Sequence, residues 1–245
     1  MAMDQPQFHA MPNRRRIAFR HLPGSGPTIV FLPGYRSDMA GGKATALAAW
    51  AETEGRACLR FDYSGCGESP GDFAEGTLGR WQDEAAALLA RQVTGPVVLV
   101  GSSMGGWIAL LLGRALGPQL AGLIGIAAAP DFTDWGYTTE QKRRLAAGET
   151  LLEDNPYGPE PKPTHPGFWA DGQARRVLAG EIAIDCPVRL FHGQDDADVP
   201  PEISLRLARA LRSTDVQVTL VKGGDHRLSR DGDIALLLRT VAALA

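Results

Sequence analysis

The sequence is poor in cysteine, and its few cysteines are not arranged for cross-linking or metal binding. It contains 3 cysteines in 245 residues, and Cys58, Cys66 and Cys186 are not close enough in sequence to suggest a pair. A secreted disulfide framework needs paired cysteines, and cysteine-based zinc sites use close Cys-x-x-Cys spacings. We expect neither, and the scarcity of cysteine favours a reducing compartment.

Long apolar runs and an excess of positive charge are missing as well. No stretch approaches the roughly 18 apolar residues of a membrane-spanning helix, and the N-terminal segment lacks the apolar core of a secretory signal. The formal net charge is -3, so no general basic field would attract nucleic acid. We therefore expect no integral membrane association, no nucleic-acid partner and a cytoplasmic location.

The remaining composition is typical of one folded domain that spans residues 1–245. Apolar residues make up 44% of the chain and charged residues 22%, which is sufficient for a sizeable core. Residues 1–13 have little periodicity and are predicted to form a flexible tail. Beyond them, apolar runs of strand length alternate with helical periodicity, which predicts an α/β fold with a mostly parallel central sheet flanked by helices. A monomer and a small homo-oligomer are both compatible with this pattern.

The alternation also locates the expected elements. Strands are expected at residues 27–35, 56–65, 96–103, 120–129, 186–193 and 216–224. Helices are expected at residues 41–55, 77–93, 104–116, 201–213 and 231–244. Between residues 130 and 185 the alternation stops and prolines become frequent. A segment this long between two parallel strands is either a cap over a site or a disordered insertion.

Aromatic residues within this insertion favour the cap. They are Trp135, Tyr137, Tyr157, Phe168 and Trp169. A cap that folds over a site would present some of these side chains to the substrate. We expect Trp135, Tyr137 and Trp169 to line the substrate pocket.

A glycine-rich segment near the middle of the chain contains the candidate nucleophile. Gly101-Ser102-Ser103-Met104-Gly105 fits the pattern G-x-S-x-G with Ser103 at its centre. Ser102 does not fit, because no glycine follows it two residues later. The pattern lies between an expected buried strand and an expected helix, where a tight turn raises a serine hydroxyl above the sheet. The sequence therefore predicts Ser103 as a nucleophile at a helix N-terminus.

A serine hydroxyl also needs a nearby base, and a third group must orient that base. The chain has 5 histidines. His226 follows the last expected strand, at the sheet edge that also carries Ser103, so we predict that it is the base. His192 ends another strand and is interpreted as a packing or turn residue. The others lie in the tail, in an early turn and in the insertion: His9, His21 and His165.

The acid that orients His226 is expected after the strand that precedes the last one. There the segment HGQDDADVP offers Asp195, Asp196 and Asp198. The sheet edge alone does not distinguish these three carboxylates.

This segment resembles the acid-bearing loop of serine hydrolases with the α/β-hydrolase fold, which follows the pattern G-x-x-D-x-x-V-P. The resemblance implies that Asp196 takes the acid position, with Asp198 as the next candidate. The chain order Ser103, Asp196, His226 is also the order of that fold.

Longer stretches are similar to one branch of this family. They are LPGYRSDMAGGKA, RFDYSGCGES, TLGRWQDE, GSSMGGW, CPVRLFHGQDDADVP and STDVQVTLVKGGDHRL. The branch includes the mitochondrial palmitoyl-protein thioesterase and mycophenolic acid acyl-glucuronide esterase of animals, and the similarity covers most of residues 29–235. A location in the mitochondrial matrix is implied by this resemblance, but no clear transit peptide precedes the domain, so the cytoplasm remains the prediction.

Two backbone N–H groups are expected to stabilise the developing oxyanion. The first belongs to Met104, because it directly follows the nucleophile. The second is expected in the segment FLPGYRSD, at the end of the first expected strand. There the backbone N–H of Tyr35 resembles the second oxyanion donor of the family. The Tyr35 side chain could equally well line the pocket.

The resemblance implies hydrolysis of carboxylic esters or acyl thioesters through an acyl-enzyme. The expected partner is a small-molecule ester or thioester, or an acylated protein, and no cofactor or metal is expected. An acyltransferase that uses the same three residues is one alternative. The other is a ligand receptor that keeps the fold but does not turn its ligand over.

Overall fold

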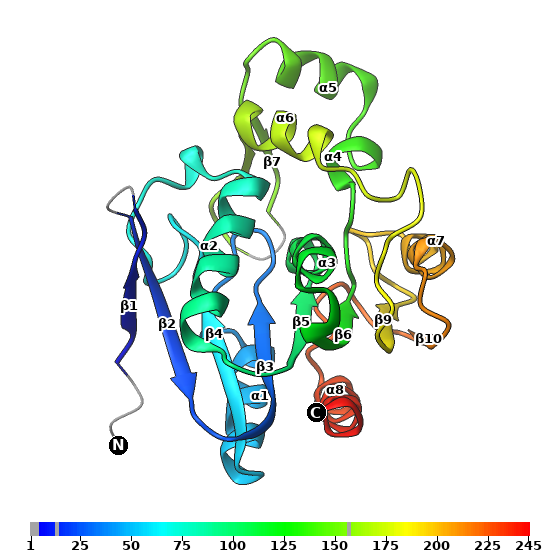
Figure 1. Ribbon diagram of the computed structural model, residues 1–245. Helices are drawn as coiled ribbons and strands as arrows, with labels where there is room; N and C mark the ends of the chain where they lie inside the picture. The colour runs from blue at the N-terminus through cyan, green and yellow to red at the C-terminus, as the bar shows by residue number, and fades with distance from the viewer. Residues whose placement is uncertain (1–4, 13–14, 156–157) are drawn as a thin grey trace.

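Apolar side chains alternate along the central strands, and this alternation builds two separate cores on the two faces of one sheet. In β3, Val30 and Leu32 contribute to one core, whereas Ile29 and Phe31 contribute to the other. Successive side chains of a strand point to opposite faces, so an uninterrupted apolar run must be covered on both sides. The computed structural model describes residues 5–12, 15–155 and 158–245 (Figure 1).

The sheet has eight strands in the order β1-β2-β4-β3-β5-β6-β9-β10. Their bounds are β1 Gln7–Ala10, β2 Arg16–Leu22, β3 Ser25–Leu32, β4 Arg56–Phe61, β5 Val97–Ser102, β6 Leu120–Ile126, β9 Val188–Gly193 and β10 Val216–Val221. Within this order, every pair of neighbouring strands in the series β4-β3-β5-β6-β9-β10 is parallel, and β2 is antiparallel to both β1 and β4. The predicted α/β fold with a mostly parallel sheet is therefore confirmed.

Helices cover both faces of this sheet. The long ones are α1 Gly42–Thr53, α2 Leu78–Gln92, α3 Met104–Leu116, α7 Glu202–Ala210 and α8 Asp231–Leu244, and two short 3-10 helices span Phe73–Glu75 and Gly117–Gln119. Residues of α2, α3 and α7 join one core, and residues of α1 and α8 join the other. Within the described residues, we find no helix with the length and apolar character needed to cross a membrane.

Helix α2 shows how the sequence specifies one of these elements. Thr77 is its N-cap, and the Thr77 side chain accepts a hydrogen bond from the Arg80 backbone N–H at 3.1 Å. A cap of this kind satisfies one of the N–H groups that the first helical turn leaves without a partner. Trp81 and Leu88 lie on its buried face, as expected for an amphipathic helix that packs against a sheet.

The N-terminal prediction needs correction at residues 7–10. Gln7–Ala10 forms strand β1 and pairs with β2, and the following Met11 is 8% exposed and belongs to the core. Most side chains of β1 are exposed, so the strand has no apolar alternation for sequence analysis to detect. The part of the predicted tail at residues 1–4 and 13 lies outside the described residues.

The segment between β6 and β9 contains α4 Phe132–Trp135, α5 Thr139–Ala146, β7 Leu151–Glu153, β8 Lys162–Thr164 and α6 Pro166–Ala174. In Figure 1 its helices lie beyond the ends to which the arrows of β3 and β5 point. The Asp131 carboxylate accepts hydrogen bonds from the backbone N–H groups of Val177 and Leu178, both at 2.8 Å. This contact joins the beginning and the end of the segment. Tyr157, one of the aromatic residues of the predicted cap, lies outside the described residues.

Candidate functional site

The candidate nucleophile lies in a strained turn between β5 and α3. Ser103 has φ 53° and ψ -118°, a backbone conformation that residues with a Cβ atom seldom adopt. Its N–H donates to the Ile126 carbonyl at 2.9 Å, and its carbonyl accepts from Ala129 at 3.1 Å. Hydrogen bonds to the end of β6 and to the loop that follows it therefore hold the strained residue in place.

Two glycines make this turn possible because other backbone atoms occupy the space of their missing side chains. A Cβ atom on Gly101 would lie 2.4 Å from the Gly105 carbonyl oxygen, and one on Gly105 would lie 2.1 Å from the Leu32 carbonyl oxygen. Both distances are far below van der Waals contact. The glycines of the G-x-S-x-G pattern thus allow α3 to begin directly against the ends of β5 and β3.

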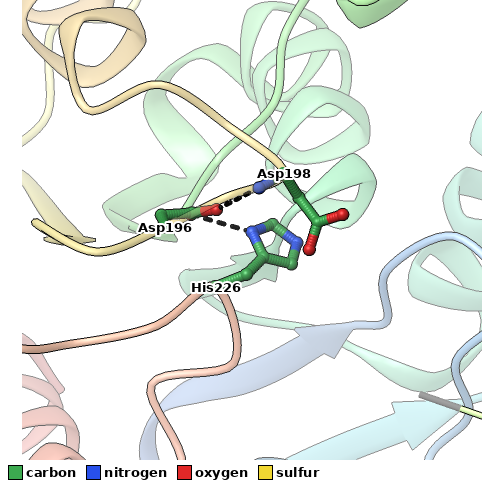
Figure 2. A group of neighbouring side chains, drawn as sticks. All are labelled: Asp196, Asp198 and His226. Atoms are coloured by element: carbon green, nitrogen blue, oxygen red, sulfur yellow. Dashed lines mark hydrogen bonds and ion pairs between the residues drawn. The ribbon is translucent and has the colours of Figure 1, made fainter. Parts of the chain in front are cut away.

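The structure brings Ser103, His226 and Asp196 together from three different loops. They follow β5, β10 and β9, whose parallel directions place all three loops at one edge of the sheet. His226 Nε2 lies 3.1 Å from Ser103 Oγ, and His226 Nδ1 lies 2.8 Å from Asp196 Oδ2. Figure 2 shows the imidazole between the Asp196 and Asp198 side chains.

The Asp196 carboxylate is fully buried and richly hydrogen-bonded. Its Oδ1 accepts from the backbone N–H groups of Asp198 and Val199, both at 2.9 Å. Burial raises the pKa of Asp196, but hydrogen bonds from His192 and His226 and the charge of His226 outweigh it and hold that pKa well below its usual range. Asp196 is therefore ionised at neutral pH and can accept the N–H of His226.

The two neighbouring carboxylates have different surroundings. Asp195 is exposed, and its N–H donates to the Gly224 carbonyl at 2.9 Å. Asp198 lines the cavity beside Ser103, and ligand atoms of Asp196, Asp198 and His226 lie within 4.8 Å of one another. One nitrogen and two carboxylate oxygens at this spacing could hold a cation, although Asp196 and His226 are already hydrogen-bonded directly to each other. The expected absence of a metal remains a prediction.

His192 contacts Asp196 as well, which the sequence interpretation did not anticipate. It is fully buried, and its Nε2 lies 3.2 Å from Asp196 Oδ2 and 2.9 Å from the Val199 carbonyl oxygen. Its Nδ1 lies 2.6 Å from Ser204 Oγ. A carbonyl oxygen only accepts, so the network assigns the proton to Nε2, and the Ser204 hydroxyl can donate to Nδ1. The only sequence signal for this contact was the spacing, because His192 lies four residues before Asp196.

The two candidate oxyanion donors lie beside Ser103. Met104 is the first residue of α3, where backbone N–H groups have no partner within the helix. A Cβ atom on Gly34 would lie 3.4 Å from Ser103 Cβ, so the backbone that leads into Tyr35 passes next to the nucleophile. The Tyr35 side chain also lines the adjoining cavity, and its hydroxyl donates to the Pro163 carbonyl at 2.9 Å. Both interpretations of Tyr35 are thus compatible with its position.

A cavity of about 290 Å³ adjoins Ser103 and His226 on the side of the insertion. We call it the aromatic cavity, because four aromatic side chains line it: Tyr35, Phe132, Trp135 and Tyr137. The Tyr137 hydroxyl lies 2.7 Å from Thr164 Oγ1, and burial raises the pKa of Tyr137 to about 12. The aromatic cavity therefore joins the candidate nucleophile to an aromatic wall, and its lining also includes the charged side chains of Glu153, Lys162 and Asp198.

The prediction that Trp169 lines the substrate pocket needs correction, because Trp169 is not among the side chains that line this cavity. Its indole N–H donates to the Thr133 carbonyl at 3.0 Å, and the ring packs against the cluster of Tyr137, Leu145 and Leu151. Trp169 therefore supports the insertion from within, whereas Trp135 and Tyr137 face the cavity.

A second cavity, of about 450 Å³, also reaches Ser103 and His226. We call it the basic cavity, after the side chains of Arg36, Lys43 and Arg227 that line it. Other lining residues come from the loops after β3 and β10, including Gly34, Asp38 and Ser229. Ser103 and His226 thus lie where an aromatic cavity and a basic cavity meet.

Comparison with known proteins places this chain among hydrolases. Residues 29–239 match the model of the alpha/beta hydrolase family. The mitochondrial palmitoyl-protein thioesterase ABHD10 of mouse is 39% identical over 236 residues, which cover 94% of this chain and 78% of the relative. The structure of mouse alpha/beta hydrolase domain-containing protein 10 matches with a TM-score of 0.91 at 35% identity, covering 98% of each chain. A putative hydrolase from Agrobacterium vitis S4 also matches with a TM-score of 0.91, at 39% identity and 98% coverage of each chain.

The predicted cytoplasmic location is wrong in the light of these relatives. Five curated relatives, from 35% to 39% identical, are all named as mitochondrial proteins. This points to the mitochondrion rather than the cytoplasm. A low cysteine content indicates reducing conditions but does not specify a compartment, which explains the error.

Proposed function

The chain belongs to the alpha/beta hydrolase family, and on this premise we propose that it hydrolyses carboxylic esters or acyl thioesters through an acyl-enzyme formed on Ser103. The observation that supports this most directly is the continuous hydrogen-bonded series of three side chains. Ser103 Oγ lies 3.1 Å from one nitrogen of His226, and Asp196 Oδ2 lies 2.8 Å from the other. This arrangement provides a nucleophile, a base and a group that orients the base.

In the first half of the proposed reaction, Ser103 Oγ attacks the acyl carbonyl carbon while His226 Nε2 takes the hydroxyl proton. The nitrogen that faces Asp196 must then carry a hydrogen, because a carboxylate can only accept. Asp196 fixes this tautomer and stabilises the imidazolium that forms. Its low pKa means that it remains a carboxylate throughout. His226 then protonates the leaving alcohol or thiol, and the acyl-serine ester remains.

The developing oxyanion accepts hydrogen bonds from the backbone N–H groups of Met104 and Tyr35. Removal of one such donor in a comparable enzyme costs about 3–4 kcal/mol of transition-state stabilisation. Backbone donors held by β3 and α3 need no rearrangement as the charge develops, because the close packing at Gly105 fixes their relative position.

In the second half, His226 takes a proton from water, and the resulting hydroxide attacks the acyl carbon. The carboxylic acid leaves, and Ser103 regains its hydrogen from His226. Every group in this proposed cycle belongs to the chain, to the acyl substrate or to the attacking water.

The acyl group occupies the aromatic cavity in this proposal. Phe132, Trp135 and Tyr137 give it an apolar wall next to Ser103, and burial of an acyl chain there is favourable by roughly 0.8 kcal/mol per CH₂ group. The elements between β6 and β9 then serve as the cap of a single domain. The thioesterase names of the relatives suggest acyl thioesters, small or protein-linked, as the first substrates to test.

The proposal is tested by intact-protein mass spectrometry during turnover of p-nitrophenyl esters and acyl thioesters of increasing chain length. We expect a transient mass increase equal to the acyl group, located on Ser103 by peptide mapping. Turnover without an adduct at Ser103 would contradict the acyl-enzyme.

Product analysis in the presence of added alcohol separates hydrolysis from acyl transfer. Release of the free acid as the main product supports hydrolysis. A new ester formed with the alcohol as the main product would favour an acyltransferase, and binding of substrate without any product would favour a receptor.

A further inference from the structure

The basic cavity is not used by the proposed reaction, although it shares Ser103 and His226 with the aromatic cavity. It is large enough for a fragment of a small-molecule ligand, since binding sites commonly measure about 300–1,000 Å³. Three cationic side chains line it, Arg36, Lys43 and Arg227, against one carboxylate, that of Asp38. The basic cavity therefore has an excess of positive charge, which the aromatic cavity, lined by two carboxylates and one lysine, does not have.

The hydrogen-bond acceptors of Arg36 and Lys43 hold these two cations in position without neutralising them. Arg36 Nη1 donates to the Pro161 carbonyl at 2.6 Å, and Lys43 Nζ donates to the Arg227 carbonyl. Both acceptors are uncharged. The Asp38 carboxylate accepts from the Ala40 N–H in its own loop at 2.9 Å.

Burial lowers the pKa of Lys43 to about 8, and the charge of Arg227 acts in the same direction, against the opposite effect of Asp225 and Asp233. Lys43 is therefore mainly cationic at neutral pH while partly withdrawn from water. An anion bound nearby would favour its charged form, since opposite charges stabilise each other most where solvent is partly excluded.

A substrate whose scissile bond lies at Ser103 must place its two halves on different sides of that atom. An acyl chain is apolar and fits the aromatic cavity, which leaves the basic cavity for the alcohol or thiol half. We propose that the basic cavity is a leaving-group subsite that takes an alcohol or thiol carrying an anionic group, a phosphate or a carboxylate. This inference rests on the proposed function and specifies its substrate class: acyl esters or thioesters with a negatively charged leaving group.

The test uses three hexanoyl thioesters that differ only in the leaving thiol. These are 2-mercaptoethanol, which is neutral, 3-mercaptopropionate, which is a carboxylate, and 2-mercaptoethyl phosphate. Each is assayed with the wild-type protein, the single variants Arg36→Gln and Arg227→Gln, and the double variant. Arg209→Gln, at an exposed arginine on α7 outside both cavities, is the matched control.

The wild type is expected to hydrolyse at least one anionic thioester with a kcat/KM about tenfold above that of the neutral one. In the double variant this preference falls by about tenfold or more, since hydrogen bonds to charged groups contribute at this level. The neutral thioester should change less than about twofold in the same variant. Arg209→Gln should leave all three rates unchanged. The phosphate and carboxylate substrates show which anion the subsite takes.

Hydrolysis of the neutral thioester serves as the internal check on folding and on the proposed function. If the wild type hydrolyses it but shows no preference for either anion, the subsite is overturned while the hydrolase proposal stands. Equal losses on all three substrates in the arginine variants would also overturn it. If Ser103→Ala leaves hydrolysis intact, the proposed function itself fails.

A binding measurement keeps the proposal testable if the double variant does not fold. The thiol products are added as inhibitors of the hydrolysis of the neutral thioester by the wild type and by the single variants. We expect 2-mercaptoethyl phosphate or 3-mercaptopropionate to inhibit more strongly than 2-mercaptoethanol, and less strongly in Arg36→Gln. Equal inhibition by all three thiols would contradict the proposal.

Discussion

The reacting groups and the walls of the aromatic cavity are built in different ways. Ser103, Asp196 and His226 lie on short loops directly after parallel strands, and backbone hydrogen bonds fix the turn that holds the serine. Most of the aromatic wall comes from the insertion, whose helices pack on one another and also contact the body, with Phe168 of α6 buried in the core on that face of the sheet. This difference suggests that changes at the sheet edge affect turnover of every substrate, whereas changes in the insertion affect the choice among substrates.

The largest effect is expected at the nucleophile. Ser103→Ala removes the atom that forms the acyl-enzyme, so kcat should fall by at least about 10³-fold for all acyl lengths alike. Steady-state kinetics over an ester series measures this, with thermal unfolding as the check on folding. Ser102→Ala should lower kcat far less, because Ser102 is not hydrogen-bonded to His226. A Ser103→Ala variant with near-normal turnover would refute the assignment.

The next largest loss of kcat is expected at Asp196, and it distinguishes this carboxylate from that of Asp198. Asp196→Asn can no longer stabilise the imidazolium and favours the wrong tautomer of His226, so kcat should fall by about 10²–10⁴-fold. Asp198→Asn should cost far less, since the Asp198 contact to Asp196 is made by its backbone N–H. The kcat values of the two variants, measured on one substrate, give the ranking. The reverse ranking would assign the acid to Asp198.

His192 is expected to act through Asp196 as a positioning residue. His192→Leu removes one donor to the carboxylate, and kcat should fall by about tenfold with KM unchanged. The hydrogen bond from His192 lowers the pKa of Asp196, so its loss raises that pKa. A more basic Asp196 carboxylate stabilises the imidazolium more strongly, so the acid limb of the pH–rate profile should move to higher pH, and His192→Gln, which keeps a donor, should restore part of the wild-type profile.

A different result is expected if His192 contributes only to the stability of the fold. A merely structural residue would lower the melting temperature without moving the pH profile of the folded fraction. That outcome in His192→Leu would remove the positioning role.

The smallest effect on turnover, and the clearest on selectivity, is expected in the insertion. Trp135→Ala enlarges the aromatic cavity, so the ratio of kcat/KM for long over short acyl chains should rise by about tenfold, the discrimination that a few methylene groups provide. Trp169→Ala is the comparison variant, because it lies outside the cavity and should lower stability instead. Rates over the same ester series, together with melting temperatures, distinguish the two. Equal changes in selectivity would contradict the assignment of the cavity walls.

Much of the body could be predicted from the sequence because its strands are buried on both faces. β3 and β5 are apolar without interruption at their centres, and G-x-S-x-G marks a turn where a Cβ atom on either glycine would collide with backbone. β1 was missed because exposed side chains give an edge strand no periodicity. Burial alone does not explain which strands were predicted, because β2 was also missed although residues 17–19 are buried, whereas the largely exposed β10 was predicted.

Contacts between distant segments account for what sequence analysis missed. Both Trp135 and Trp169 are aromatic residues of the insertion, but only the packing of α4 and α6 directs one toward the cavity and the other toward Thr133. The contact between His192 and Asp196 likewise depends on how the loop after β9 folds back on the end of that strand.

The central claim is that Ser103 is a hydroxyl activated by His226. The most direct measurement is intact-protein mass spectrometry after brief exposure of the folded protein to a fluorophosphonate, followed by peptide mapping. We predict one adduct, on Ser103, that is absent in Ser103→Ala and forms far more slowly in His226→Ala. An unmodified wild-type protein, or an adduct that forms equally fast without His226, would contradict the account.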